Sequence, residues 1–232
     1  LRRARRRVFV SGSQPVIGST PTLISLGMSC QTAHQLAHFA EANAGKIQFT
    51  KGPVDWLICQ PNSLAEWLDA GLIDFDGHEI VEQKNHAYWP RFDFWFWHGF
   101  MDHHGDSRAL NIANGIEREL QKLAYQRSVF QTLDPENTVF FVSNTQNNLT
   151  TEVFEIGEEE RFTFTSDIVD RLQNSLDNFF KSKTNIHWIT REDRYSGNKP
   201  NPDNFHFLPP EPSDWKGSQQ EWGIILRNIV GL

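Results

Sequence analysis

Hydrophobic residues near the start of the chain change from strand-like to helix-like spacing across one tight turn. Residues 22–26 form a short apolar run that ends at Gly27, as in a buried strand. Ser29 can then cap a helix. Small and apolar side chains recur after it at helical spacing, at Ala33, Leu36, Ala37 and Ala40. The pattern therefore predicts a strand, a turn and a helix that begins at or next to Cys30.

The rest of the chain continues this alternation. Further helices are predicted over 62–71, 112–130, 166–179 and 218–230, and extended segments over 47–49, 78–100, 138–142 and 186–189. Residues 144–151 and 192–212 are polar and predict loops, whereas residues 153–164 show no decisive period. Such alternation predicts a layered α/β (α+β) fold, with a sheet flanked by helices.

The charge and the length of the chain restrict its organisation. Its 232 residues can form one substantial core. Five arginines lie within residues 2–7, so we expect a flexible basic tail over 1–21 and a single domain over 22–232. The formal net charge of −7 argues against a folded surface for nucleic acid. No apolar run reaches the roughly 18 residues of a membrane span.

Cysteine and aromatic residues change this picture in two ways. Cys30 and Cys59 are too few for a disulfide framework, and no secretory pattern is visible, so we expect a reducing, cytoplasmic compartment. A single Cys30–Cys59 disulfide remains an alternative, and it would block thiol chemistry. Eight Trp and eighteen Phe predict an aromatic-rich core and could also line an apolar groove.

Cys30 is the first candidate for chemistry. A thiol in the first turn of a helix faces unpaired backbone N–H groups and the positive end of the helix dipole, and both favour the thiolate. The same amides could stabilise an oxyanion. The structural alternative is a buried cysteine that serves as a small hydrophobic residue.

Three short motifs extend this candidate. Residues 25–30 are Ser-Leu-Gly-Met-Ser-Cys, residues 52–57 are Gly-Pro-Val-Asp-Trp-Leu, and residues 96–100 are Phe-Trp-His-Gly-Phe. Together they resemble a bacterial family of papain-like cysteine peptidases, with its Ser-Leu-Gly-x-x-Cys, Pro-Phe-Asp-Trp and Phe-x-His-Asp-Phe segments. Val54 stands in place of the family's phenylalanine, and Gly99 in place of its aspartate.

The resemblance implies a papain-like fold with a mixed sheet and a hydrolase or acyltransferase that works through an acyl-enzyme on a peptide, ester or other acyl substrate. It implies Cys30 as nucleophile, His98 as base and a place for Asp55 near Cys30. His103 and His104 are substitutes for the base, His104 in particular. Asn144 or Asp106 could orient the imidazole. A carboxylate at Asp55 is also expected to accept hydrogen bonds from turn amides.

Two other classes of function stay open. A non-catalytic module could use an aromatic groove to bind a glycan or peptide. Alternatively, His98, Asp102, His103, His104 and Asp106, with His78 and His86 nearby, could form a metal-dependent hydrolase. The spacing matches no known metal motif, and no phosphate-binding glycine loop or dinucleotide fingerprint occurs, so we expect neither metal nor cofactor.

Overall fold

A five-stranded, wholly parallel sheet organises the chain. The computed structural model describes residues 20–104, 107–147, 159–197, 203–210 and 215–232. The sheet contains β1 (Thr22–Ser25), β2 (Gln48–Thr50), β9 (Thr138–Ser143), β11 (Asn185–Arg191) and β13 (Phe205–Leu208), in the order β13-β11-β9-β1-β2. Numbered along the chain, this order is 2-1-3-4-5, as in doubly wound sheets of the flavodoxin type.

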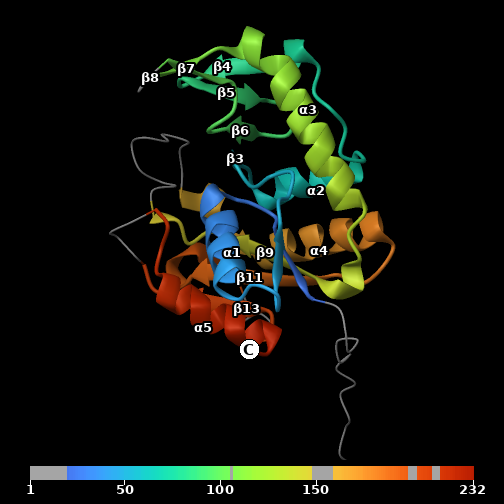
Figure 1. The fold of residues 1–232 in the computed structure, drawn as a ribbon, viewed down its shortest axis with the longest axis vertical. Coiled ribbons are helices and arrows are strands. Elements are labelled where there is room, and N and C mark those ends of the chain that lie inside the picture. Colours follow the sequence, from blue (N-terminus) through green and yellow to red (C-terminus); the bar gives the residue numbers. More distant parts are fainter. Residues whose placement is uncertain (1–19, 105–106, 148–158, 198–202, 211–214) are drawn as a thin grey trace, which may run out of the picture.

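Helices cover both faces of this sheet. α1 (Cys30–Ala42) and α5 (Gln219–Val230) lie on one face, and α4 (Ser166–Phe180) lies on the other (Figure 1). Neighbouring residues of β9 illustrate the consequence, because Phe141 packs with α1 and α5 while Phe140 packs on the opposite side. Strands buried on both faces need continuous apolar runs, which explains why residues 138–142 are so clearly strand-like in the sequence.

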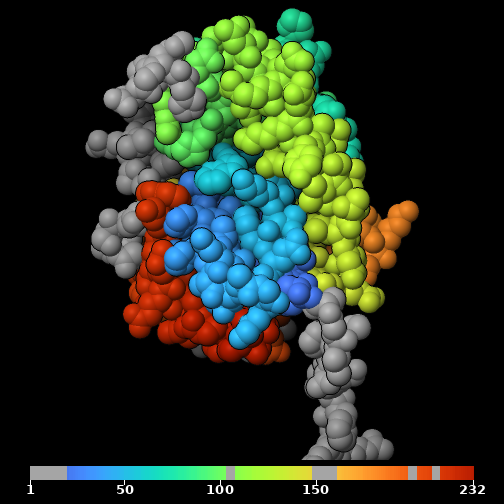
Figure 2. All heavy atoms as spheres, viewed as in Figure 1, coloured from blue at the N-terminus to red at the C-terminus, as the bar shows by residue number. Residues whose placement is uncertain are grey.

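An antiparallel unit is inserted between β2 and β9. It contains β3 (Leu57–Ile58), α2 (Pro61–Asp69), β4 (Val81–Gln83), β5 (His86–Trp89), β6 (Phe94–Phe96), β7 (Met101–His104), β8 (Ser107–Leu110) and α3 (Ile112–Gln131). Four of its strands form a sheet in the order β3-β6-β5-β4, and β7 and β8 form a hairpin. α3 runs along one side of the molecule, from this unit down to the parallel sheet (Figures 1 and 2).

The mixed α/β class is confirmed, but parallel and antiparallel pairings lie in separate sheets of the described chain rather than in one mixed sheet. One hydrophobic cluster nevertheless runs through both. It joins Phe94 and Trp67 of the inserted unit to Phe140 of β9 and Leu172 of α4. Aromatic side chains fill it, with edge-to-face pairs such as Trp67–Phe94, whose ring centroids are 5.4 Å apart. The predicted aromatic-rich core is therefore present.

Short elements at the polar end of the chain were missed by the sequence prediction. Residues 192–212 were predicted as a loop, yet the described part contains the strands β12 (Tyr195–Ser196) and β13. β12 pairs with β10 (Phe164–Thr165). Strands of two to four residues at a sheet edge carry too few side chains to show a period. The described part contains no helix that is both long and apolar enough to cross a membrane.

Two histidines meet across the edge of the parallel sheet. His187 Nδ1 on β11 lies 3.0 Å from His206 Nε2 on β13, and the two rings stack. Burial, followed by the charge of His206, lowers the pKa of His187 to about 4. His187 is therefore neutral in the folded protein at pH values where an unfolded histidine is protonated. It contributes stability above pH 6.5 that is lost as the pH falls from about 6.5 to about 4.

We expect His187→Gln to flatten this pH dependence. The wild type should lose about 3 kcal/mol of unfolding free energy through this group between pH 7 and pH 4, and the variant should not. Chemical denaturation at both pH values measures it. The control is His38→Gln on the exposed face of α1, which should keep the wild-type slope. Equal slopes for wild type and His187→Gln would contradict the assignment.

Candidate functional site

The order in which successive strands are added to the parallel sheet reverses at β1. β2 lies on one side of β1 and β9 on the other, so the loops that leave β1 and β9 diverge at their carboxyl ends. In open parallel sheets, ligands bind in the crevice at this switch point. The loop after β1 leads into Cys30, and the loop after β9 carries Asn144 to Gln146. The fold therefore brings Cys30 to the edge where a site is expected.

Cys30 begins α1, as the sequence predicted, and Ser29 occupies the N-cap position. The Ser29 side chain makes no capping hydrogen bond, so the first amides of α1 are not covered by it. The Cys30 thiol is half-buried, and its Sγ lies 3.9 Å from Gln146 Oε1. Both cysteines are free thiols, which removes the disulfide alternative from the structure.

The electrostatics of the thiol differ from the expectation of a stabilised thiolate. Burial raises the pKa of Cys30 to about 11, and the hydrogen bond from its own backbone N–H lowers the pKa by less. Desolvation penalises the charged thiolate more than the helix start favours it. Cys30 is thus a neutral thiol at neutral pH.

The wall on one side of Cys30 is a network of buried amides and hydroxyls. Gln31 Oε1 accepts a hydrogen bond from Thr145 Oγ1 at 2.6 Å, and Gln31 Nε2 donates to the Trp215 carbonyl at 2.7 Å. One turn later, Gln35 Nε2 donates to the Lys216 carbonyl. These bonds join α1, the loop after β9 and residues 215–217, which fixes the start of α1 in the crevice.

Asp55 stabilises the turn that follows β2. Its Oδ2 accepts a hydrogen bond from the Gly52 amide at 3.0 Å, as predicted for a turn carboxylate. A Cβ on Gly52 would lie 2.8 Å from the Ser25 carbonyl, so only glycine lets this turn approach β1 so closely. Asp55 is 1% exposed, and burial raises its pKa well above the usual value. The second motif therefore packs directly against the first.

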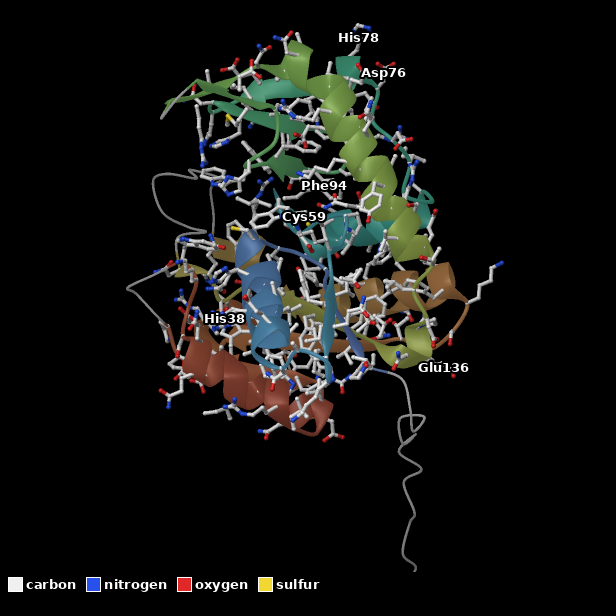
Figure 3. All side chains as sticks on the ribbon, in the orientation of Figure 1. His38, Cys59, Asp76, His78, Phe94 and Glu136 are labelled. Atoms are coloured by element: carbon white, nitrogen blue, oxygen red, sulfur yellow. The ribbon has the colours of Figure 1, made fainter. Side chains whose placement is uncertain are left out.

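A similar close approach joins the loop before α1 to β3. Gly27 has a φ of +83°, and a Cβ there would lie 2.9 Å from Cys59 Sγ. Met28 pairs with Cys59 through an isolated antiparallel bridge, and β3 in turn pairs with β6. Figure 3 shows Cys59 between the start of α1 and the antiparallel sheet. β6 leads directly into a turn.

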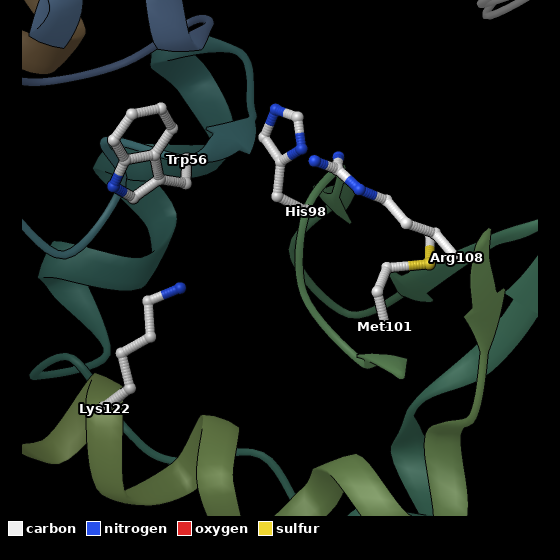
Figure 4. A pocket seen from close by; sticks show the side chains of 5 residues that line it. All are labelled: Trp56, His98, Met101, Arg108 and Lys122. Carbon is white, nitrogen blue, oxygen red and sulfur yellow. The ribbon is translucent and has the colours of Figure 1, made fainter. Parts of the chain in front are cut away.

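His98 occupies that turn. Its ring lies edge-on to Trp56, with centroids 6.0 Å apart, and it shares a pocket with Trp56 (Figure 4). Burial, then the positive charges of Arg108 and Lys122, lower the pKa of His98. A neutral imidazole can accept a proton. The third motif thus follows a strand that pairs with β3, whereas the hydrogen-bond partner of the Cys30 thiol is Gln146 and not His98.

The hydrogen bonds of Asn144 hold two loops together and do not orient a histidine ring. It is completely buried, its Nδ2 donates to the carbonyls of Phe162 and Arg194, and its Oδ1 accepts from the Arg191 amide. All these partners are backbone groups, and none is an imidazole. Asn144 therefore holds the loop after β9 to the neighbouring loop, so the structure gives no support to its predicted role beside the base.

The remaining candidates fall largely outside the described side chains. The side chains of His103, His104 and Asp106 are not described, so neither the substitute base His104 nor the alternative orienting group Asp106 can be placed. Within the described part, no group of three His, Cys, Asp or Glu side chains is arranged to hold a metal. His78 lies at the far end of the inserted unit from α1 (Figure 3).

Sequence reasoning missed Gln146, Gln31 and His34. His34 follows Cys30 by four residues, so the two side chains share a face of α1, with Cβ atoms about 6 Å apart. Its ring also contacts Trp215, at 5.3 Å between centroids. The spacing of four within a predicted helix was the available signal for His34. Gln146 could not be found in this way, because only the parallel pairing of β1 and β9 brings it to the thiol.

Comparisons with known proteins add no identity. No family model, no curated protein and no solved structure matches the chain.

Two substitutions of Asp55 should distinguish the contribution of its hydrogen bond to stability from the contribution of its charge. Asp55→Ala leaves the buried Gly52 amide without its acceptor and should cost about 1–3 kcal/mol of unfolding free energy. Asp55→Asn keeps an acceptor and should cost less. Because the pKa of Asp55 is raised by folding, wild-type stability should fall as the pH rises above about 4, and Asp55→Asn should lack this contribution. Chemical denaturation at pH 5 and pH 8 tests both, and equal losses in the two variants at both pH values would contradict the hydrogen-bonding role.

Proposed function

We propose that the protein is a thiol-dependent hydrolase or acyltransferase in which Cys30 attacks an acyl carbonyl and His98 serves as the base. The observation that supports this proposal is the packing of the second sequence motif against the first at the carboxyl end of β1, with the third motif directly after β6, which pairs with β3. Gly27 and Gly52 permit the close approaches, and the bridge between Met28 and Cys59 joins the loop before α1 to the end of β3, whose partner β6 precedes His98.

The chemistry follows from the groups at hand. The imidazole of His98 takes the thiol proton as Sγ bonds to the carbonyl carbon, and the negative charge moves to the carbonyl oxygen. The uncapped amides at the start of α1 are the donors suited to this oxyanion. The leaving group departs with the proton from His98, which leaves a thioester on Cys30. Water, or an amine or hydroxyl acceptor, then attacks the thioester and regenerates the thiol.

The raised pKa of Cys30 shapes the mechanism. A thiol that is neutral at rest must transfer its proton during the attack, so the substrate has to bring the Cys30 and His98 side chains together. His34 is a competing base, because it lies one turn from Cys30 on the same helix, and the experiment below distinguishes the two.

The papain-like fold that the resemblance implies stays a prediction. The acyl-transfer chemistry does not depend on it, because a thiol or hydroxyl nucleophile with a nearby base recurs on unrelated folds. The alternative of a glycan- or peptide-binding module loses its main support. Five of the eight Trp side chains are packed in the core, namely Trp67, Trp89, Trp95, Trp188 and Trp222.

Acylation of the thiol tests the proposal directly. The full chain is incubated with p-nitrophenyl acetate, and intact-protein and peptide mass spectrometry follow the acetyl group. We expect acylation at Cys30 and not at Cys59, because Cys59 is 2% exposed. His98→Ala should slow acylation at pH 7 by about 100-fold or more, the usual contribution of a general base. Cys59→Ala is the control and should acylate at the wild-type rate.

Two results would contradict the assignment of Cys30 as nucleophile and His98 as base. Acylation that is equally fast in wild type and His98→Ala, but slow in His34→Ala, would make His34 the base. No acylation of Cys30 in wild type, with the melting temperature unchanged, would leave the cysteine structural. Alkylation with iodoacetamide adds a check on the resting thiol, because a pKa of about 11 predicts a rate that still rises above pH 9.

A further inference from the structure

A pocket of about 360 Å³ lies beside His98 (Figure 4). Trp56 forms one wall, α3 contributes Lys122, and the hairpin of β7 and β8 contributes Met101 and Arg108. Figure 4 shows the Arg108 guanidinium beside the His98 imidazole and the Lys122 side chain directed toward the same space. The volume lies within the range of pockets for small molecules.

Positive charge is concentrated in this pocket although the protein carries a net charge of −7. Arg108 makes no ion pair with any side chain that the structure describes. Lys122 Nζ lies 3.4 Å from Glu119 Oε2, but Glu119 also accepts from Arg118 at 3.3 Å, so one carboxylate is shared between two cations. Both cations line the same pocket as His98, and after burial their positive charges lower the pKa of His98.

The rest of the lining is apolar. Trp56 is half-buried and presents its indole ring to the space, and the Met101 thioether lies opposite (Figure 4). An indole ring favours contact with another planar ring, whereas guanidinium and ammonium groups bind phosphate or carboxylate oxygens. A ligand that suits both parts of the lining carries an anionic group on a planar or apolar body.

We propose that this pocket holds the anionic end of the substrate, a phosphate or carboxylate on a planar body, with Arg108 and Lys122 as its ligands and Trp56 against its ring. The identification of the bound molecule as substrate rests on the proposed function, since His98 belongs to both. Bound in this way, the anion fixes the ring beside Trp56 and leaves the remainder of the molecule free to extend toward Cys30.

Four small probes separate the contributions. Phenyl phosphate and benzoate carry a ring and an anion, phenol carries the ring alone, and inorganic phosphate carries the anion alone. Binding is measured by isothermal titration calorimetry at low salt, on the full chain with Cys30→Ala, which removes the nucleophile and keeps the pocket. We expect one of the two anionic aromatic probes to bind about tenfold more tightly than phenol and than inorganic phosphate. The preferred probe identifies the anion.

Substitutions in the pocket complete the test. Arg108→Ala and Lys122→Ala should each weaken binding of the preferred probe by about tenfold or more, as expected for loss of a charge-assisted hydrogen bond. Arg108→Lys should recover part of it. Arg171→Ala removes an arginine that pairs with Asp69 on α4 and α2, away from the pocket, and should leave binding unchanged. Raising the salt from about 0.05 M to about 0.5 M should weaken binding of the anionic probes but not of phenol.

Failure of this inference can be distinguished from failure of the proposed function. Equal binding of phenol and both anionic probes, or anion binding that survives Arg108→Ala combined with Lys122→Ala, would overturn the anion site whatever Cys30 does. Anion binding with the expected losses, in a protein whose Cys30 is never acylated, would leave the anion site intact and overturn only its assignment to an acyl-transfer substrate.

Discussion

Burial of the parallel sheet on both faces is the constraint on which the rest of this structure depends. With α1 and α5 on one face and α4 on the other, β1, β9 and β11 are largely buried, and apolar residues fill their central positions. Side chains that could bind a ligand are then found mainly in the loops at the strand ends. Because all five strands are parallel, the loops that leave β1 and β9 emerge at one edge. This is why a thiol, two glutamines and a threonine from distant parts of the chain meet there.

The inserted antiparallel unit completes that edge. Its aromatic core is continuous with one side of the parallel sheet, so the unit packs as part of the same hydrophobic interior. Its position is set by two glycine contacts and one backbone bridge, which bring β3 against the loop before α1. These contacts leave no room for a side chain. The inserted unit also carries His98, Trp56 and the basic residues Arg108 and Lys122, which share one pocket.

The same burial that assembles the site opposes ionisation within it. Cys30 and Asp55 both have raised pKa values because the charged form of each is poorly solvated. His98 has a lowered pKa for the corresponding reason, with neighbouring cations adding to the effect. The resting site is therefore close to neutral at the thiol and the imidazole, while positive charge persists at Arg108 and Lys122.

Local patterns in the sequence determined the elements. The apolar run before Gly27, the helical spacing after Ser29 and the residues of β9 predict their structures because each depends on side-chain spacing within one segment. The placement of Cys30 at the start of a helix and the hydrogen-bonded turn of Asp55 follow from the same local chemistry.

Tertiary structure decided the rest. The strand order, the separation into two sheets, the contact of Gln146 with Cys30 and the structural role of Asn144 all depend on which distant segments pair. The direction of the Cys30 pKa shift was decided in the same way, because desolvation depends on the whole surrounding fold, and a sequence shows only the local helix start that acts against it.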